Sequence, residues 1–530
     1  MSSKGPSLSR LFLPFFISLV IFTRFINLNW GQGFFFHPDE NNMASAVSRL
    51  SFSDFNPHFF AYGQFPLYLA FFTQKILRQS GFDSAVYILR SYSALFSSLS
   101  VLVFFQIGQI LFRCQKTVKI FLLLLVFSPG LIQLAHFGTT ESFLIFVFAV
   151  NLYLSFKLLK TSQIFPLIFL SALSSGLGLA SKITSLIFIA PIYLAIFFRF
   201  FLSKKYKKFF FYSLLFSILY FLFFILFSPY NLISFPDFFG TMRYEASVAT
   251  GAIKVFYTSQ FQHTPAYLFQ FQKIFPHTSG LPVFILFFVG IFLLLRHLKN
   301  LSSKNHPLLI LVVSSLIYFL YTGQLYTKWT RFASPLFFLF PLSATYVLGK
   351  ISRLHFLYPL IIACLIPGFL FLNTYLRPDI RLVASNWVDQ NLPPHSYILS
   401  EAGNILNLPL GTQNPYQVAN FDFFTLDNQP QPIDDLARQI YKSDYILVPS
   451  RRIFKNQKGD DFPISQRYYQ TLFSGNLGFT KIKQFSQPTG LFLDPESAEE
   501  TWTVFDNPTI RVYKKTTPMN FSDYQNILTL

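Results

Sequence analysis

The sequence predicts an all-α polytopic membrane protein of about eleven transmembrane helices, followed by a small extracytoplasmic α/β domain. Three observations lead to this fold class. Of the 530 residues, 52% are hydrophobic and 12% are charged, whereas soluble domains carry about 25% charge. The 73 phenylalanines exceed the needs of a water-soluble core, so the apolar surface requires lipid as its solvent. The basic residues that give the net charge of +19 lie in short segments between apolar runs, which is typical of membrane topology and not of nucleic-acid binding.

Apolar runs of about 20 residues have the length that a transmembrane helix needs. Such runs predict spans at residues 11–29, 84–112, 119–136, 141–159, 163–180, 183–202, 209–228, 281–296, 307–322, 332–349 and 355–373. The first run follows a basic start without a small-residue cleavage site, so we interpret it as a span and not as a cleavable signal. The region 163–202 is the least distinct, because only a short glycine-containing stretch separates its two spans.

Five connections between the spans are basic, and all five fall on the same side as the basic N-terminus if eleven spans are correct. Their cations are Arg113, Lys116 and Lys119; Lys157 and Lys160; Lys204, Lys205, Lys207 and Lys208; Arg296, Lys299 and Lys304; and Lys350 and Arg353. Because basic connections stay in the cytoplasm, this side is predicted to be cytoplasmic. The first outer loop (30–83), the second large outer loop (229–280), the short stretch 323–331 and the tail then lie outside. We therefore divide the chain into a membrane domain, residues 1–375, and an outer domain, residues 376–530.

The tail differs in composition from the rest of the chain. Polar helical stretches at 379–390 and 433–441 alternate with short strand-like runs at 397–399 and 445–448. Alternating helical and strand patterns with turn signals between them predict a small α/β domain.

The sharpest chemical feature is His37-Pro38-Asp39-Glu40, just outside the first span. Two adjacent carboxylates at a membrane surface are costly unless they are solvated, paired or bound to a metal. Pro38 disfavours helix at the preceding residue and can itself begin one. The alternative is a plain helix N-terminus whose acidic residues complement the helix dipole.

The surroundings of this motif add a resemblance to a known family. An amphipathic stretch (42–50) and an aromatic, proline-rich run (56–68) follow it, and Arg90 is embedded in the second span. In this order the first outer loop resembles the entry region of the GT-C membrane glycosyltransferases, the superfamily of the protein O-mannosyltransferases (glycosyltransferase family 39) and the aminoarabinose–lipid A transferases. The resemblance implies two helices in this loop that lie along the membrane surface.

Four further motifs extend the resemblance over most of the chain. Residues 136–141 resemble the short second outer loop, with Glu141 where the family often has Asp. Residues 176–184 resemble a small-residue turn that carries a lysine, here Lys182, and residues 328–335 resemble a late Arg-aromatic-Pro motif that contains Arg331. Residues 504–513 resemble a strand pair of the outer tails.

The resemblance implies transfer of a hexosyl or pentosyl unit from a polyprenyl-phosphate donor to an extracytoplasmic protein, lipid or glycan. Such transfer passes through an oxocarbenium-like state, and a carboxylate can take the proton of the acceptor hydroxyl. The leaving phosphate is anionic and needs cations. We therefore predict Asp39 as the base, with Glu40 positioning the acceptor or holding a divalent cation beside it. Arg331 and Lys182 are predicted to bind the donor phosphate.

Other residues of the outer face are predicted to contact substrate. They are Glu141, His58, Tyr62, Arg243 and Glu245. Each has an alternative: a helix cap for Glu141, a structural role for His58, an interfacial belt for Tyr62 and a solvated pair for Arg243 and Glu245. Lys182 and Arg331 have one as well, because long cationic side chains snorkel to the interface.

Together these features predict a multi-pass protein in the lipids of a prokaryotic plasma membrane. Its active site is predicted to lie on the outer face. No cofactor is required with certainty, the metal at Asp39 and Glu40 stays open, and no nucleic acid is expected. The main rival function is a lipid or sugar transporter or flippase, for which internal repeats and ionisable residues near the membrane midplane would be expected. A second rival is an inactive relative that serves as a scaffold.

Overall fold

Apolar helices occupy every predicted span in the computed structural model, which describes residues 8–112, 114–298, 303–401, 408–411, 414–427, 431–490 and 492–529. Within these residues six helices are long and apolar enough to cross a membrane, and two bent pairs bring the number to eight. Three shorter apolar helices, 14–25, 164–179 and 281–296, fill the remaining predicted positions. The protein is therefore an integral, multi-pass membrane protein.

Most of the helices belong to the membrane bundle, and two further groups of helices form the first and second outer loops. The bundle contains α1 (Leu8–Phe25), α4 (Phe82–Leu111), α5 (Gln115–Val126), α6 (Pro129–His136), α7 (Glu141–Leu158), α8 (Ile164–Leu179), η1 (Ile183–Ile189), α9 (Ala190–Ile196), η2 (Phe197–Phe201), α10 (Tyr206–Phe227), α15 (Leu281–His297), η4 (Ser303–Asn305), α16 (His306–Gly323), α17 (Thr330–Ala333), η5 (Ser334–Leu336), α18 (Leu339–Leu348) and α19 (Leu354–Leu376). The first outer loop forms α2 (Pro38–Arg49) and α3 (Gln64–Ile76), and the second forms α11 (Tyr230–Ile233), α12 (Phe235–Thr250), η3 (Phe256–Phe261), α13 (Leu268–Lys273) and α14 (Phe275–Ser279). The two helices expected in the first loop are thus present.

The span predicted at 119–136 is not one straight helix. It bends by 49° between α5 and α6, where Pro129 begins the second helix. Because proline has no N–H to donate, carbonyls at the end of α5 need other partners. The buried guanidinium of Arg24 donates to the carbonyl oxygens of Leu125 at 3.1 Å and Val126 at 2.9 Å. A cation from the first span therefore stabilises a bend in the third.

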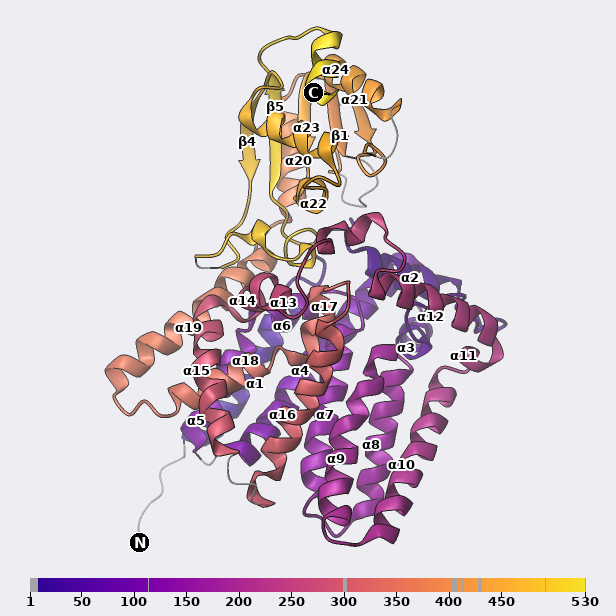
Figure 1. The fold of residues 1–530 in the computed structure, drawn as a ribbon, viewed down its shortest axis with the longest axis vertical. Helices are drawn as coiled ribbons and strands as arrows, with labels where there is room; N and C mark the ends of the chain where they lie inside the picture. The colour runs from indigo at the N-terminus through magenta and orange to yellow at the C-terminus, as the bar shows by residue number, and fades with distance from the viewer. Residues whose placement is uncertain are drawn as a thin grey trace.

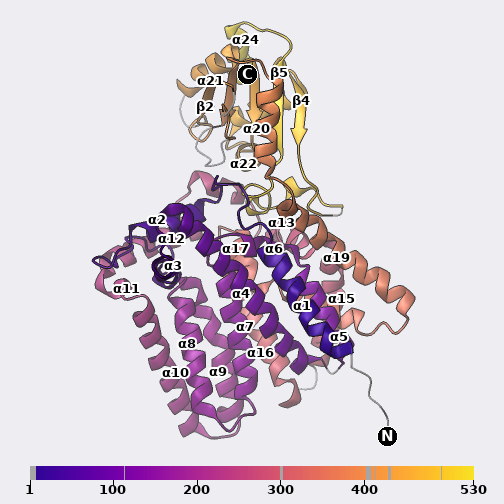
Figure 2. The same cartoon turned by 180° about the vertical axis from the view of Figure 1, so that it is seen from behind.

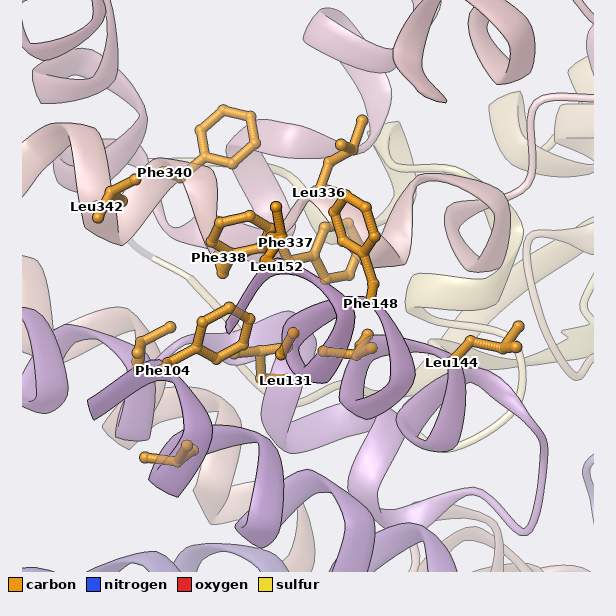
Figure 3. Packing of buried hydrophobic residues seen from close by; sticks show 14 of the residues in the cluster. Phe104, Leu131, Leu144, Phe148, Leu152, Leu336, Phe337, Phe338, Phe340 and Leu342 are labelled. Atoms are coloured by element: carbon orange, nitrogen blue, oxygen red, sulfur yellow. The ribbon is translucent and has the colours of Figure 1, made fainter. Parts of the chain in front are cut away.

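The core of the bundle is rich in aromatic side chains. Side chains of α4, α6 and α7 meet those of η5 and α18 around Phe338 (Figure 3). The ring of Phe338 stacks on Phe104 with centroids 4.7 Å apart and lies 6.2 Å from Phe148. On the outside, α10 exposes large apolar side chains such as Phe210 and Leu214. An exposed apolar face of this size on a long helix fits contact with lipid.

Basic connections come together in pairs in the structure. Lys116 donates to the carbonyl oxygen of Ile351 at 3.5 Å, which joins the α4–α5 and α18–α19 connections. Arg199 donates to the carbonyl oxygens of Leu158 and Thr161, which joins the end of η2 to the α7–α8 connection. Both pairings agree with connections that share one side of the membrane. Arg113 and Lys299 lie outside the described residues.

The outer domain stands on the bundle (Figure 1). It contains α20 (Ile380–Asn391), β1 (Tyr397–Glu401), β2 (Gln417–Phe421), α21 (Gln431–Lys442), β3 (Tyr445–Val448), α22 (Arg452–Asn456), α23 (Pro463–Ser474), β4 (Phe479–Phe485), η6 (Pro495–Ser497), η7 (Glu500–Trp502), β5 (Ile510–Lys515) and α24 (Phe521–Thr529). The five strands have the order β2-β1-β3-β5-β4. β1 pairs in parallel with β2 and β3, while β5 is antiparallel to β3 and β4. Seen from behind, α20 lies beside β5 (Figure 2).

The strand pair expected at 504–513 is wrong. Only β5 is a strand there, and the residues before it form η7 and turns that pack into the membrane domain. Trp502 is buried against Phe371 of α19, with ring centroids 4.5 Å apart. The carboxylate of Asp506 accepts hydrogen bonds from Tyr375 at 2.7 Å and from Gln133 at 3.2 Å. Burial raises the pKa of Asp506 to about 7. The tertiary contact with the bundle therefore overrides the local strand pattern.

Candidate active site

Asp39 and Arg331 form an ion pair at the end of the bundle that lies next to the sheet domain (Figure 1). Pro38 begins α2 after an extended His37, so Asp39 lies in the first turn of that helix. Arg331 lies in the first turn of α17, and its guanidinium is 4.5 Å from the centre of the Trp329 ring. The two side chains keep 18% and 23% of their surface exposed. A carboxylate and a guanidinium thus meet where both remain accessible.

The neighbouring Glu40 points into the protein instead. Its carboxylate forms a bidentate pair with Arg90, at 2.7 and 2.8 Å, and neither side chain is exposed. Arg90 also donates to the carbonyl oxygens of Leu28 and Trp30. The backbone N–H of Gly138 donates to Glu40 Oε1 at 2.8 Å. A Cβ at Gly138 would lie 2.7 Å from that oxygen, so the approach of the second outer loop requires glycine.

Lys182 and Glu141 form a second ion pair, with Nζ 2.7 Å from Oε1. The Lys182 ammonium is 4.9 Å from the ring centre of Tyr62. Backbone bonds hold the first outer loop against the turn that carries Lys182, because Phe65 N–H donates to the carbonyl oxygen of Ala180 at 3.0 Å. Residues predicted separately from three segments therefore meet in one cluster.

The ring of Phe332 connects the two ion pairs. Its centre is 5.6 Å from the ammonium of Lys182 and 5.8 Å from the guanidinium of Arg331. The two cations predicted to bind phosphate therefore lie near the same ring.

The second large outer loop contributes Glu245 of α12. Glu245 is exposed as a whole residue, but nearby protein removes part of the water around its carboxylate and so raises its pKa. The nearby charge of Lys182 opposes this rise. Glu245 also contributes to the raised pKa of Tyr62, after burial and Glu141. Arg243 is exposed on the same helix, and its backbone carbonyl accepts from Ser247.

The two histidines of the first outer loop occupy different surroundings. His58 is 62% exposed and pairs with Asp54 at 3.7 Å, and no contact of the described residues brings it to Asp39. His37 is buried between the rings of Phe137 and Phe505, with both centroids 4.5 Å away. Burial, followed by the charge of Arg331, lowers its pKa well below the usual range. His37 therefore packs as a neutral ring.

Glu499, in the segment before η7, is a site residue that sequence reasoning missed. Its carboxylate accepts from the backbone N–H of Thr330 and from Gln260 Nε2, both at 3.0 Å. Thr330 begins the helix that carries Arg331. Burial and then the adjacent Glu500 raise the pKa of Glu499. No local pattern in the polar tail indicates this contact, because it depends on how the outer domain meets the bundle.

The donors around Asp39 do not fit a metal ion that Glu40 would share. Both oxygens of Glu40 already accept from Arg90, and one also accepts from Gly138. Asp39 is engaged by Arg331. Among the described residues no group of three or more His, Cys, Asp or Glu side chains is arranged to hold a metal.

Comparison with known proteins gives structural matches alone. No protein-family model matches the chain, and no curated protein matches it in sequence. The archaeal oligosaccharyltransferase AglB from Archaeoglobus fulgidus, in complex with an inhibitory peptide and a dolichol-phosphate, has a TM-score of 0.54 at 13% identity, over 90% of this chain and 73% of that chain. The apo form from the same organism has a TM-score of 0.52 at 13% identity, over 93% and 76%. A form tethered to an acceptor peptide with the NVT sequon has a TM-score of 0.50 at 12% identity, over 95% and 88%. The predicted GT-C type of fold is thereby confirmed.

Proposed function

We propose that this protein is a glycosyltransferase that moves a sugar from a polyprenyl-phosphate donor to an acceptor outside the cytoplasm. One observation carries the proposal. An accessible carboxylate, Asp39, and two cations, Arg331 and Lys182, come from distant segments and gather at one end of a membrane-spanning bundle. A base beside an anion-binding pair is what sugar transfer from a lipid phosphate needs.

In the proposed reaction Asp39 accepts the proton of the acceptor hydroxyl. The hydroxyl oxygen then forms a bond to the anomeric carbon, and the bond from that carbon to the phosphate oxygen breaks. Arg331 binds the phosphate that leaves, and Lys182, whose ammonium also lies near the Phe332 ring, helps to balance the negative charge of that phosphate. In the present structure the carboxylate of Asp39 is paired with the guanidinium of Arg331. The donor phosphate would take this place and so free the carboxylate.

The remaining predicted residues take different parts in this proposal. Glu40 acts as a positioning residue, because its carboxylate already accepts hydrogen bonds from Arg90 and from the Gly138 N–H. Glu141 holds Lys182, and Tyr62 packs beside it. Glu245, with Arg243 on the same exposed helix, would face the acceptor or the donor headgroup. We assign no substrate contact to His58, which pairs with Asp54 at the surface.

The structural relatives support a proposal about the kind of substrate. The Archaeoglobus fulgidus enzyme is an oligosaccharyltransferase, and its structures contain dolichol-phosphate and peptide ligands. We propose a polyprenyl-phosphate carrier for this chain as well, with a protein, lipid or glycan acceptor, in the plasma membrane of a prokaryote and with the site on the outer face. The transporter alternative gains no support from these relatives.

Replacement of Asp39 tests the enzyme proposal. Asp39→Asn keeps the size of the side chain and removes its ability to accept a proton. We expect turnover of a labelled polyprenyl-phosphate sugar by purified protein to fall by about 10²–10⁴-fold, while the thermal unfolding midpoint stays close to wild type because Asp39 is partly exposed.

The matched control is Asp54→Asn, an exposed carboxylate of the same loop that pairs with His58. It should keep wild-type turnover. Full activity in Asp39→Asn, with donor and acceptor panels that the wild type uses, would overturn the assignment of the base.

A further inference from the structure

The outer domain contains a cleft that the proposed reaction does not use. An open cleft of about 920 Å³ runs between the end of α22, the helix α23 and the strands β4 and β5. Its walls combine lysines, aromatic rings and neutral amides. A cleft of this size is within the range of ligand sites, which are roughly 300–1,000 Å³.

The charge of the cleft is positive. Lys455, Lys458 and Lys481 line it. Among the described residues one carboxylate, Glu496, lines the cleft, and it is paired with Arg511, whose Nη1 is 3.0 Å from Oε1. Burial and the neighbouring cations Lys273, Arg451 and Lys455 lower the pKa of Lys458. Cations that lie close together repel one another, and a bound anion stabilises their charged forms.

The neutral part of the lining suits a polyhydroxylated ligand. Phe473 is 42% exposed at the cleft, and its ring meets Phe454 edge to face at 5.2 Å. Exposed aromatic rings offer flat apolar faces, and the amide of Gln470 offers a donor and an acceptor beside them. The amide oxygen of Gln466 accepts from the Gly459 N–H, so Gln466 offers its amide NH₂ as a donor. The side chain of Gln457 also lines the cleft, and none of the described residues donates a hydrogen bond to its buried Oε1. A donor from a bound ligand would satisfy this acceptor.

We propose that this cleft binds an anionic oligosaccharide, a linear sugar chain that carries carboxylate or phosphate groups. The inference rests on the proposed function, because such a chain would be part of the glycan or glycolipid that the enzyme modifies or builds. The lysines bind the anionic groups, Phe473 packs against a sugar ring, and the glutamines bind hydroxyl groups. An acidic peptide would satisfy the lysines alone, so the aromatic and amide lining favours the saccharide.

Equilibrium binding to the full chain in lipid nanodiscs tests this site. The probes are fluorescently labelled tetragalacturonate, the neutral maltotetraose and a hexaglutamate peptide, and fluorescence anisotropy is the readout. We expect saturable binding of tetragalacturonate at least tenfold tighter than that of either other probe. Lys455→Ala/Lys458→Ala should weaken it about tenfold or more, and Phe473→Ala should weaken it as well.

Lys483→Ala is the matched control, because Lys483 lies on the same strand as Lys481 but outside the cleft lining, over the Trp387 ring. It should bind like wild type, and all these surface variants should keep the wild-type unfolding midpoint. Absence of saturable tetragalacturonate binding, or binding unchanged in both cleft variants, would overturn the proposal. Hexaglutamate bound as tightly as tetragalacturonate would also overturn it, in favour of a peptide site. Because binding needs no donor, it should persist in Asp39→Asn, which separates failure of this site from failure of the transfer reaction.

Discussion

Adjacent carboxylates in the first outer loop have opposite surroundings. Asp39 is partly exposed beside Arg331, whereas Glu40 is fully buried against Arg90. A buried carboxylate whose oxygens are all hydrogen-bonded contributes to the position of its neighbours more than to chemistry at the surface. The pair Glu40–Arg90 also ties α2 to the second span, so it holds the helix turn that presents Asp39.

Glu40→Gln should therefore affect stability before it affects turnover. It leaves the guanidinium of Arg90 buried without a counter-charge, which costs about 3–5 kcal/mol in comparable buried pairs. We expect a lower thermal unfolding midpoint and, because Glu40 positions Asp39, a loss of turnover in the folded fraction that is smaller than the loss in Asp39→Asn. Glu40→Gln/Arg90→Gln should recover part of the loss. A variant of wild-type stability and no turnover would show instead that Glu40 acts in the reaction.

Substitution of Arg331 tests its role in binding the donor phosphate. A forked guanidinium matches phosphate oxygens better than an ammonium does, so Arg331→Lys should raise the KM for the donor, and Arg331→Ala should raise it further. Lys328→Ala serves as control, since Lys328 donates to Thr264 and to the carbonyl oxygen of Tyr326. The measurement is donor KM at saturating acceptor. Wild-type KM in both Arg331 variants would reduce this residue to an interfacial anchor.

At the scale of elements, the short helix α17 depends on a contact from the outer domain. Glu499 accepts from the first N–H of α17, and its own backbone N–H donates to the carbonyl oxygen of Lys273. The orphan N–H groups at a helix start need such acceptors. The outer domain thereby helps to fix the element that carries Arg331.

Glu499→Gln is expected to loosen this element without removing a reacting group. We predict a several-fold higher KM for the donor with kcat nearly unchanged, because α17 would sample positions in which Arg331 does not meet the phosphate. A reaction role would lower kcat instead, so the split between KM and kcat is the measurement.

Glu500→Gln is the matched comparison for this prediction. Its carboxylate accepts from Asn456 at 2.9 Å and lies 3.4 Å from Arg452, both in the outer domain. It should change stability more than donor KM. Equal effects of the two variants on KM would contradict a specific contact of Glu499 with α17.

At the scale of the whole molecule, the predicted orientation places the basic connections in the cytoplasm and the sheet domain outside. The two native cysteines make this testable, because Cys114 is exposed on a basic connection and Cys364 is buried. In intact cells a membrane-impermeant maleimide should label Asn476→Cys, at an exposed turn between α23 and β4. Cys114 should be labelled only after permeabilisation. The reverse pattern would overturn the orientation.

Much of the fold was predictable from local pattern. All eleven predicted spans coincide with apolar helices, and Pro38 begins α2 as expected. The predicted outer-domain helices and strands near 380, 398, 433 and 445 also form. Less of the site was predictable. Asp39, Glu141, Lys182 and Arg331 were selected by their motifs, but their pairing was not, and His58 was placed with them although it lies at the surface.

The sequence by itself determined that the chain spans a membrane many times, because an apolar run of about 20 residues has no other environment of comparable free energy. It also determined where α2 starts, since proline acts on its immediate neighbours. Tertiary structure decided which of two adjacent carboxylates stays accessible, which cation each acid meets, and that residues near 500 pack against the helix that carries Arg331. These outcomes depend on contacts between segments as far apart as Asp39 and Arg331 or Thr330 and Glu499. Local preference is silent about such contacts, because they form only when the helices pack.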